Sequence, residues 1–122
     1  MIEIVARNGS PEAMLCPAFI CDACRKQVME AGNVIYAVRY PDQSERETSP
    51  LFVAHKGACD MAVQQWLAAN YPVADGWSDL WDEIDDFLAY LGGNFKRSFA
   101  EDADGQYVPH VVVMPATSPK LP

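Results

Sequence analysis

Four side chains that bind metal ions in many proteins occur as two pairs. Cys21 and Cys24 are separated by two residues, and His55 and Cys59 are separated by three. Zinc prefers thiolate and imidazole ligands in a tetrahedral arrangement. A Cys-x-x-Cys turn brings its two sulfurs to the same side, so that they can share one ion. The pattern Cys-x2-Cys…His-x3-Cys therefore predicts one structural Zn2+ per chain, bound by these four residues.

Other interpretations of the cysteines remain open. Cys21 and Cys24 could form a redox pair, or the cysteines could be buried as small hydrophobic residues. Cys16, five residues before Cys21, could be a further ligand or a reactive thiol. Because the four other residues complete a tetrahedron, we favour Cys16 as a buried small hydrophobe.

The flanking sequence predicts how the two pairs are positioned. Residues 34–40 are rich in β-branched and aromatic side chains and predict the strongest strand of the chain. Residues 51–54 predict its partner strand, which ends directly before His55. A helix is predicted from about residue 57 to residue 70, and its first turn contains Cys59. A strand end and a first helical turn would direct both side chains at one ion.

This order of elements resembles the treble-clef zinc fingers, of the zinc-ribbon and LIM-like kind. The resemblance covers about residues 17–71 and implies a knuckle, a β-hairpin and a helix, with ligands Cys21, Cys24, His55 and Cys59. The chain departs from the family pattern in its three-residue second spacing. It also has Arg25 where many such knuckles have a glycine.

The rest of the chain completes an α+β fold class in a single zinc-stabilised domain, predicted over residues 1–114. Ser78 as a helix cap, followed by acidic residues, predicts a second helix over about residues 78–92, packed alongside the first. Gly92 and Gly93 are expected to end it. The other predicted elements are an N-terminal strand pair at residues 2–6 and 14–20, a strand at 107–114 beside it, and a Pro-rich tail at 115–122.

Two features of the acidic helix have alternative explanations. Asp82 and Asp86 would lie one turn apart and could bind a cation, but a solvated helix face is the simpler expectation. Trp77 and Trp81 either form an exposed partner surface or pack the helix onto the first one.

Length and charge limit the class of protein. The chain has 122 residues and a net charge of −8, and it has no apolar run long enough to span a membrane. No signal peptide is visible, so we expect a cytoplasmic protein with reduced thiols. The acidity disfavours nucleic-acid binding, which depends on a basic surface. The finger does carry five basic residues that could form a local patch: Arg25, Lys26, Arg39, Arg46 and Lys56.

These observations favour a non-enzymatic zinc-binding protein that acts as an adaptor or regulator through contacts with another protein. A zinc ion with four protein ligands has no open position for water, so it cannot catalyse hydrolysis. An HNH-type nuclease would need a histidine near Tyr40 and another in the helix after Cys59, and neither is present. Nucleic-acid binding through the basic residues is the alternative, and thiol or metal sensing by the cysteines is a third possibility.

Overall fold

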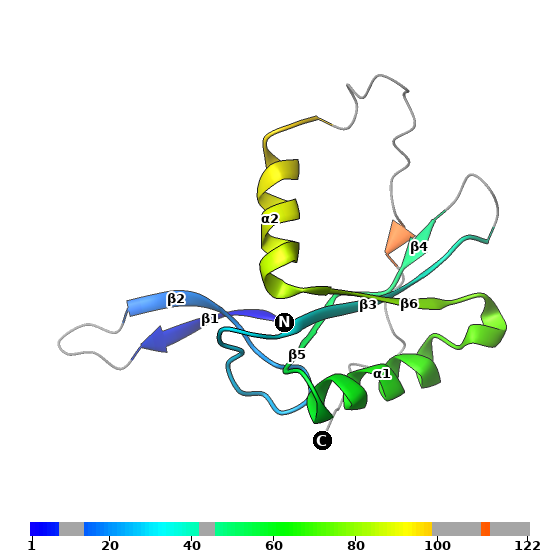
Figure 1. Ribbon diagram of the computed structural model, residues 1–122, viewed down its shortest axis with the longest axis horizontal. Helices are drawn as coiled ribbons and strands as arrows, with labels where there is room; N and C mark the ends of the chain where they lie inside the picture. The colour runs from blue at the N-terminus through cyan, green and yellow to red at the C-terminus, as the bar shows by residue number, and fades with distance from the viewer. Residues whose placement is uncertain (8–13, 42–45, 99–110, 113–122) are drawn as a thin grey trace.

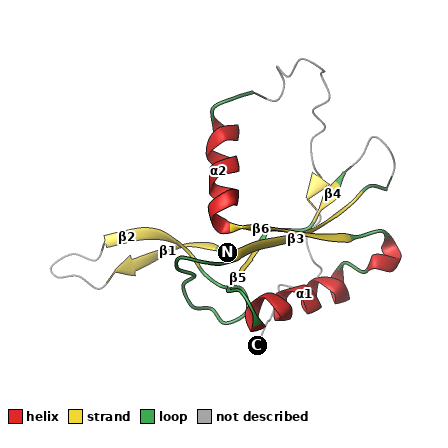
Figure 2. Ribbon diagram, in the orientation of Figure 1, coloured by secondary structure: helices red, strands yellow, loops and turns green. Residues whose placement is uncertain are grey.

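Over its described residues, the protein is a small α+β fold with two α-helices and mainly antiparallel sheets (Figures 1 and 2). The computed structural model describes residues 1–7, 14–41, 46–98 and 111–112. Its elements are β1 (Ile2–Arg7), β2 (Met14–Phe19), β3 (Asn33–Arg39), β4 (Glu47–Thr48), β5 (Phe52–Ala54), α1 (Ala58–Asn70), the 3₁₀ turn η1 (Val73–Asp75), β6 (Ser78–Glu83), α2 (Ile84–Phe95) and β7 (Val111–Val112).

The central strand of the larger sheet is β3. Its first half pairs antiparallel with β5, in a register that sets Val34 opposite Val53, and its last residues pair with β4. Its other edge pairs with β6 over six residues, with Ile35 opposite Trp81. The β-branched residues of β3 favour this extended, fully paired conformation. Four of its seven residues are at most 5% exposed: Asn33, Val34, Ile35 and Ala37.

The two faces of β3 are covered differently, because successive side chains of a strand point to opposite faces. On one face lies α1, whose Val63 and Leu67 are completely buried. A row of aromatic rings extends this core, with ring centroids 4.9–6.2 Å apart: Phe52, Trp66, Tyr71 and Trp77. In Figure 1, α2 stands on the other side of the sheet from α1. The protein is therefore layered, with helix, sheet and helix in that order.

A separate two-stranded sheet is formed by β1 and β2. They pair antiparallel from Ile2 opposite Phe19 to Arg7 opposite Met14. Pro17 lies in β2 opposite Ile4, which a two-stranded sheet tolerates because each strand has one unpaired edge. The backbone continues from β2 into the Cys21–Cys24 turn, so this hairpin leads directly into the candidate site.

The strands and the helix predicted between residues 2 and 70 are confirmed. The strands expected at residues 34–40 and 51–54 are β3 and β5, and the helix expected at 57–70 is α1. The N-terminal strand pair is β1 and β2. Trp66 packs against the core, as expected of an aromatic residue on the inner face of α1.

The prediction of a second helix at residues 78–92 is wrong in its extent. Residues 78–83 form β6, and α2 begins only at Ile84 and continues through Gly92 and Gly93 to Phe95. Pairing of β6 with β3 over six residues outweighs the local helix-cap signal of Ser78. Nor does α2 pack alongside α1, since the sheet lies between them (Figure 1).

Two further expectations are changed by the structure. Strand β7 pairs parallel with β4, and not with the N-terminal strands. The remainder of the strand expected at 107–114, including His110, lies outside the described residues, as does the tail at 115–122.

Trp77 and Trp81 do not form a joint surface, because Trp77 is 5% exposed within the core and Trp81 is 58% exposed on β6.

Candidate metal centre

The four residues singled out by their spacing come together at one point. Cys21 and Cys24 lie in the turn after β2, His55 directly follows β5, and Cys59 is in the first turn of α1. One ligand atom from each lies within 4.8 Å of all the others. Cys21 is completely buried, and the other three are half-buried. Together, these side chains could hold one metal ion.

The turn that carries Cys21 and Cys24 is closed by backbone hydrogen bonds. The N–H of Cys21 donates to the carbonyl of Lys26, and the N–H of Arg25 donates to the carbonyl of Cys21, each at 2.9 Å. Arg25 adopts a left-handed conformation with φ 65°. This conformation suits glycine better than residues with a side chain. Arg25 therefore occupies a position of the turn where a glycine would be less strained.

Asp22, between the two cysteines, attaches this turn to the strand that delivers His55. Its carboxylate is buried, accepts a hydrogen bond from the N–H of Val53 at 2.7 Å, and pairs with the Met1 ammonium at 2.9 Å. The Asp22 N–H also donates to the Val53 carbonyl. The cysteine turn and β5 are thereby fixed to each other before any ion is considered. The sequence interpretation missed this residue, although an acidic residue among Ile20, Cys21 and Ala23 is a signal for a buried carboxylate.

His55 is held in one orientation by a hydrogen bond of the ring nitrogen that faces away from the cysteines. Its Nε2 lies 2.9 Å from the backbone carbonyl of Gln27, and its Nδ1 lies 3.4 Å from the Cys24 sulfur. Because a carbonyl oxygen only accepts hydrogen bonds, Nε2 carries the proton and Nδ1 presents its lone pair to the cysteines. An outer hydrogen bond of this kind is typical of metal-binding histidines.

Cys59 is positioned by the start of α1. Gly57, directly before the helix, has φ 92°, a conformation that favours glycine. The N–H of Asp60 donates to the His55 carbonyl at 3.0 Å, which links the strand end to the first helical turn. Asp60 also accepts a hydrogen bond from the Asn33 side chain at 2.8 Å, so the helix start is anchored to β3.

The thiols of the cluster differ in acidity. Burial favours the protonated thiol of Cys21, but nearby backbone N–H groups and the His55 side chain outweigh it and lower the pKa to about 6. Burial, together with the neighbouring sulfurs of Cys21 and Cys24, raises the pKa of Cys59 to about 11. The Cys21 thiolate thus forms readily, and its negative charge disfavours ionisation of the Cys59 thiol. A bound cation would remove this conflict, because a coordinated thiol is deprotonated.

The other candidate ligands lie apart from this cluster. Cys16 is half-buried in β2 opposite Val5, and it is not among the residues brought together at the site. Asp82 and Asp86 do not share a helix face, because Asp82 belongs to β6 and Asp86 to α2. Within the described part of the chain, no second group of three or more metal-binding side chains was found.

Most of the five basic residues are engaged with other side chains. Arg39 pairs with Glu47 at 2.6 Å and stacks over Trp77, and Lys56 pairs with Glu83 at 2.7 Å. The remaining three differ: Arg25 lies 3.8 Å from the Asp22 carboxylate, Arg46 stacks over Tyr40, and Lys26 is exposed. Their charge is therefore largely compensated by neighbouring acidic and aromatic groups.

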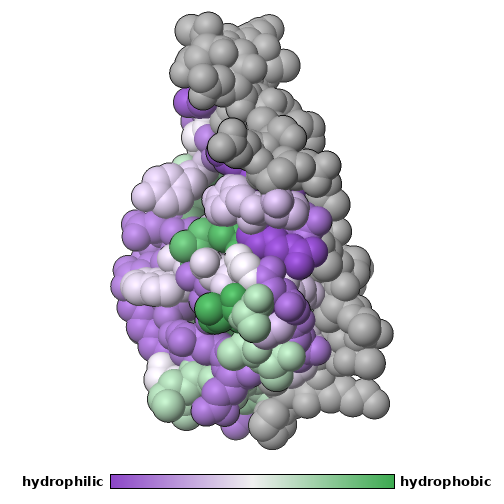
Figure 3. Space-filling model, turned by 90° about the vertical axis from the view of Figure 1, so that its right-hand side faces the viewer, coloured by the Kyte–Doolittle hydropathy of each residue, from purple (hydrophilic) through white to green (hydrophobic). Residues whose placement is uncertain are grey.

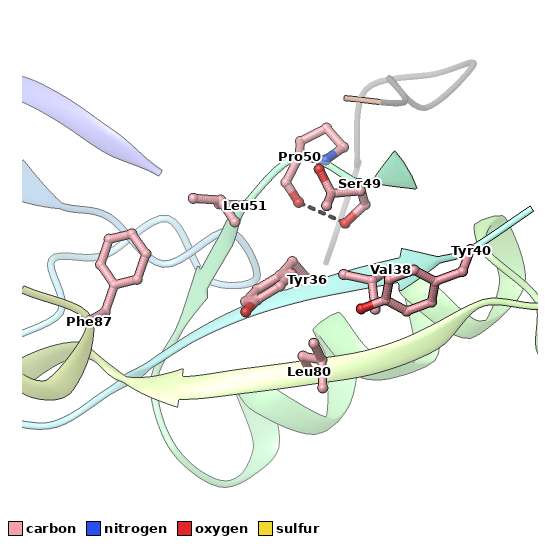
Figure 4. Close-up of a pocket in the computed structure, with 9 residues that line it drawn as sticks. Tyr36, Val38, Tyr40, Ser49, Pro50, Leu51, Leu80 and Phe87 are labelled. Atoms are coloured by element: carbon pink, nitrogen blue, oxygen red, sulfur yellow. Dashed lines mark hydrogen bonds between the residues drawn. The ribbon is translucent and has the colours of Figure 1, made fainter. Parts of the chain in front are cut away.

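A second feature is an apolar groove of about 500 Å³ on the side of the sheet that faces away from α1 (Figure 4). Tyr36, Val38 and Leu80 form its floor, and Phe87 lies at one end. The Ser49 hydroxyl accepts a hydrogen bond from the Ala37 N–H and donates one to the Pro50 carbonyl. Since both interactions are structural, this hydroxyl is not prepared as a nucleophile.

Figure 3 shows a different face of the molecule, on the right of Figure 1. Among its coloured residues hydrophilic side chains predominate, and hydrophobic ones lie in small groups.

Within the residues that the structure describes, neither helix has the length and apolarity needed to cross a bilayer. Comparison of the chain with protein-family models, curated proteins and solved structures returned no match.

Proposed function

We propose that this chain is a non-enzymatic zinc-binding module, in which one structural Zn2+ bound by Cys21, Cys24, His55 and Cys59 stabilises a surface for another protein. The observation that carries the proposal is the convergence of these four side chains within 4.8 Å. Three thiolates and one imidazole match the preference of zinc. With four protein ligands the ion keeps no position for water or substrate, so a structural site fits better than a catalytic one.

The order of elements supports a treble-clef arrangement. A cysteine turn, the antiparallel pair of β3 and β5, and α1 follow one another and each contribute to the site. Among the described residues, the short strand β4 comes between β3 and β5 in the sequence. We propose that residues 17–71 are the treble-clef finger and that β6 and α2 are additions to it.

A role as an adaptor or regulator is supported by apolar side chains that lie outside the core. The groove of Figure 4 and the exposed residues of α2 offer apolar surface for a protein partner. Nucleic-acid binding receives less support, because the basic residues of the finger mostly face acidic or aromatic partners and the chain has a net charge of −8.

Metal content tests the zinc proposal directly. Protein purified without added metal should contain one zinc per chain, and thiol reagents should modify Cys16 at once but the three clustered cysteines only after a chelator is added. Cys24→Ser should lose the zinc, whereas the matched control Cys16→Ser should keep it. A folded protein without metal, with four equally reactive thiols, would refute the proposal.

The adaptor role needs a separate experiment in cells. Leu80→Asp places a charge on the floor of the groove, and Lys26→Asp changes a charge on the exposed surface of the cysteine turn. We expect in-cell crosslinking to lose its protein adducts with Leu80→Asp and to keep them with Lys26→Asp, while both variants retain zinc. Crosslinks that are identical for both variants and the native chain would exclude the groove as the contact surface.

A further inference from the structure

Strand β6 forms an outer edge of the larger sheet. It pairs with β3 over six residues, and within the described chain no strand pairs with its other side. Five of its six residues are exposed, and the sixth is half-buried. An edge of this kind presents a row of backbone groups to which another extended chain can pair.

The register of β6 identifies which of its backbone groups face outward. The N–H of Ile84, the residue after β6, donates to the Gly32 carbonyl at 3.0 Å and continues the register of the β3–β6 pair. In an antiparallel pair, hydrogen-bonded and non-bonded positions alternate along each strand. The even-numbered residues of β6 therefore direct their backbone groups to β3, and the odd-numbered ones direct theirs away from it: Asp79, Trp81 and Glu83. In the described chain these outward groups make no backbone hydrogen bond.

The side chains of this edge are acidic around one exposed tryptophan. Trp81 is 58% exposed and lies between Asp79 and Glu83 on the face of the sheet that carries α1, where Asp79 lines a recess with residues of that helix. Asp82 lies on the opposite face. Among the described residues only Glu83 of these three acids has an ion-pair partner, Lys56 at 2.7 Å. The edge therefore has negative charge that its neighbours leave largely uncompensated, and such charge attracts cationic side chains.

We propose that the outer edge of β6 binds an extended basic segment of another protein, which adds to the sheet as an antiparallel strand. The inference rests on the proposed adaptor role and gives its partner a chemistry. Strand addition takes its affinity from main-chain hydrogen bonds and its specificity from alternate side chains. Opposite charges on neighbouring strands stabilise the pair, as does a β-branched residue beside an aromatic ring. The matching segment has lysine or arginine opposite the three acids of β6 and a β-branched residue opposite Trp81.

A second copy of β6 is a poorer occupant of this edge. In an antiparallel pair centred on Trp81, Asp79 of each copy would lie opposite Glu83 of the other. Like charges directly opposite each other destabilise a strand pair. The acidic side chains thus oppose self-association, as charged residues on edge strands commonly do, while they favour a basic strand.

A synthetic peptide tests the proposed chemistry. The sequence Lys-Lys-Val-Ile-Lys-Thr, with blocked ends, matches β6 in antiparallel register from Glu83 to Ser78. Fluorescence anisotropy of the labelled peptide with the purified full chain should give a dissociation constant on the order of 100 µM. Binding should weaken as salt is added, because the charges are exposed. The same peptide with glutamate in place of each lysine should not bind.

Methylation of the peptide backbone separates strand addition from simple charge attraction. In this register the first, third and fifth peptide residues direct their N–H groups to β6, and the others direct theirs away. N-methylation of the third and fifth residues should weaken binding by about tenfold or more, because it removes donors and blocks close approach. N-methylation of the second and fourth residues is the matched control and should leave binding unchanged. Equal affinities of these two peptides, which have the same charge and composition, would overturn the proposal.

A pair of substitutions tests the same contact from the side of the protein. Trp81→Pro removes an outward N–H and keeps the hydrogen bonds to β3, since an edge strand tolerates proline where its N–H faces solvent. This variant should lose peptide binding, whereas Trp81→Val keeps the N–H and should still bind. Circular dichroism and the melting temperature establish that each variant is folded. The comparison of methylated peptides uses the native chain and does not depend on the folding of Trp81→Pro.

Three further results would overturn the proposal. They are no binding of the lysine peptide at about 1 mM, undiminished binding to folded Trp81→Pro, and a dimer of the native chain in sedimentation velocity that Trp81→Pro abolishes. The last result would assign the edge to a second copy. Zinc content is measured on the same samples, so a failure of peptide binding is distinguishable from a failure of the proposed zinc module.

Discussion

At the scale of single residues, Asp22 determines whether the two halves of the site can meet. The cysteine turn comes from one part of the chain and His55 from another, and the Asp22 carboxylate connects them through the Val53 N–H. A charged group that is 2% exposed needs partners for its oxygens, and it finds them in Val53 and the Met1 ammonium. The carboxylate is therefore a positioning group for the candidate ligands, although it is not itself one of them.

Substitution of Asp22 should weaken both folding and metal binding. Asp22→Ala leaves the Val53 N–H and a nearby ammonium without their partner, so we expect a loss of about 2–4 kcal/mol in the free energy of unfolding. Asp22→Asn keeps an acceptor for Val53 and should lose less. Urea denaturation, combined with zinc titration against a competing chelator, measures both effects. Native stability of Asp22→Ala would show that the carboxylate is dispensable.

Asp79 gives the chain a pH-dependent contribution to stability. Asp79 is exposed on β6 but lines a shallow recess with Met61 and Gln64 of α1, and the partial desolvation there raises the pKa of its carboxyl group, so we expect a small effect on stability. An acid whose pKa is higher in the folded state costs stability when it is ionised, and this cost disappears as the pH falls below the unfolded value of about 3.9. Asp79→Asn should thus be more stable than the native chain at pH 7, with the difference vanishing in acid.

The control for this effect is Asp85→Asn in the first turn of α2. There the helix dipole favours a negative charge, so this substitution should slightly lower stability at pH 7. Thermal melts of both variants at pH 7 should shift in opposite directions. A shift of the same sign for both would mean that desolvation of the Asp79 carboxyl group is unimportant.

At the scale of elements, local signals predicted the strands and the helix around the candidate site well but failed for the segment after α1. The β-branched and aromatic residues of β3 and the apolar periodicity of α1 are strong local signals. The spacing of the four candidate ligands adds a constraint between residues that are far apart in the sequence. Residues 78–83 form β6 because they pair with β3, about forty to fifty residues earlier, and no local pattern reports that contact. Asp22 had a local signal in its apolar neighbours Ile20, Cys21 and Ala23, but its partner could not be predicted because Val53 is distant in the sequence.

Gly32 should tolerate no side chain at the junction of three elements. A Cβ atom there would lie 2.4 Å from the Val28 side chain and 3.0 Å from both the Ala54 carbonyl and the Ile84 side chain. Gly32→Ala should therefore destabilise the protein by about 1–3 kcal/mol. Gly93→Ala is the control: it meets no atom within 4 Å and should stabilise α2 by about 0.5–1 kcal/mol. Chemical denaturation of both variants would reveal whether their effects differ in sign.

At the scale of the whole molecule, the proposed metal would join three separate parts of the chain. The cysteine turn, the end of β5 and the start of α1 meet at the quartet, and α1 contributes Trp66 to the row of aromatic rings. The acidic surface adds self-repulsion, which disfavours the compact state. Stability of the native chain should for these reasons depend on the free zinc concentration.

Removal of zinc should lower the melting temperature of the whole domain. A metal present at 1,000 times its dissociation constant contributes about 4 kcal/mol, which corresponds to a shift of roughly 10 °C or more for a domain of this size. Near-ultraviolet circular dichroism of the buried tryptophans should report the same transition on addition of a chelator. Cys24→Ser should not respond to the chelator, and an equal melting temperature with and without it in the native chain would contradict a structural metal.

The position of β3 between the two ligand pairs has a consequence for the order of unfolding. An ion bound to Cys24 and His55 closes a ring of chain that contains all of β3, with 30 residues between the two ligands. Such a ring restricts the conformations that the unfolded chain can adopt, so unfolding of β3 requires more free energy while the ion is bound. Helix α2 lies outside the ring and has no buried residue, so it can open locally. We expect amide protons of β3 and β5 to exchange with solvent most slowly and those of α2 to exchange through local opening. Hydrogen exchange followed by mass spectrometry would measure this difference, and chelation should remove the protection of β3 before it affects α2.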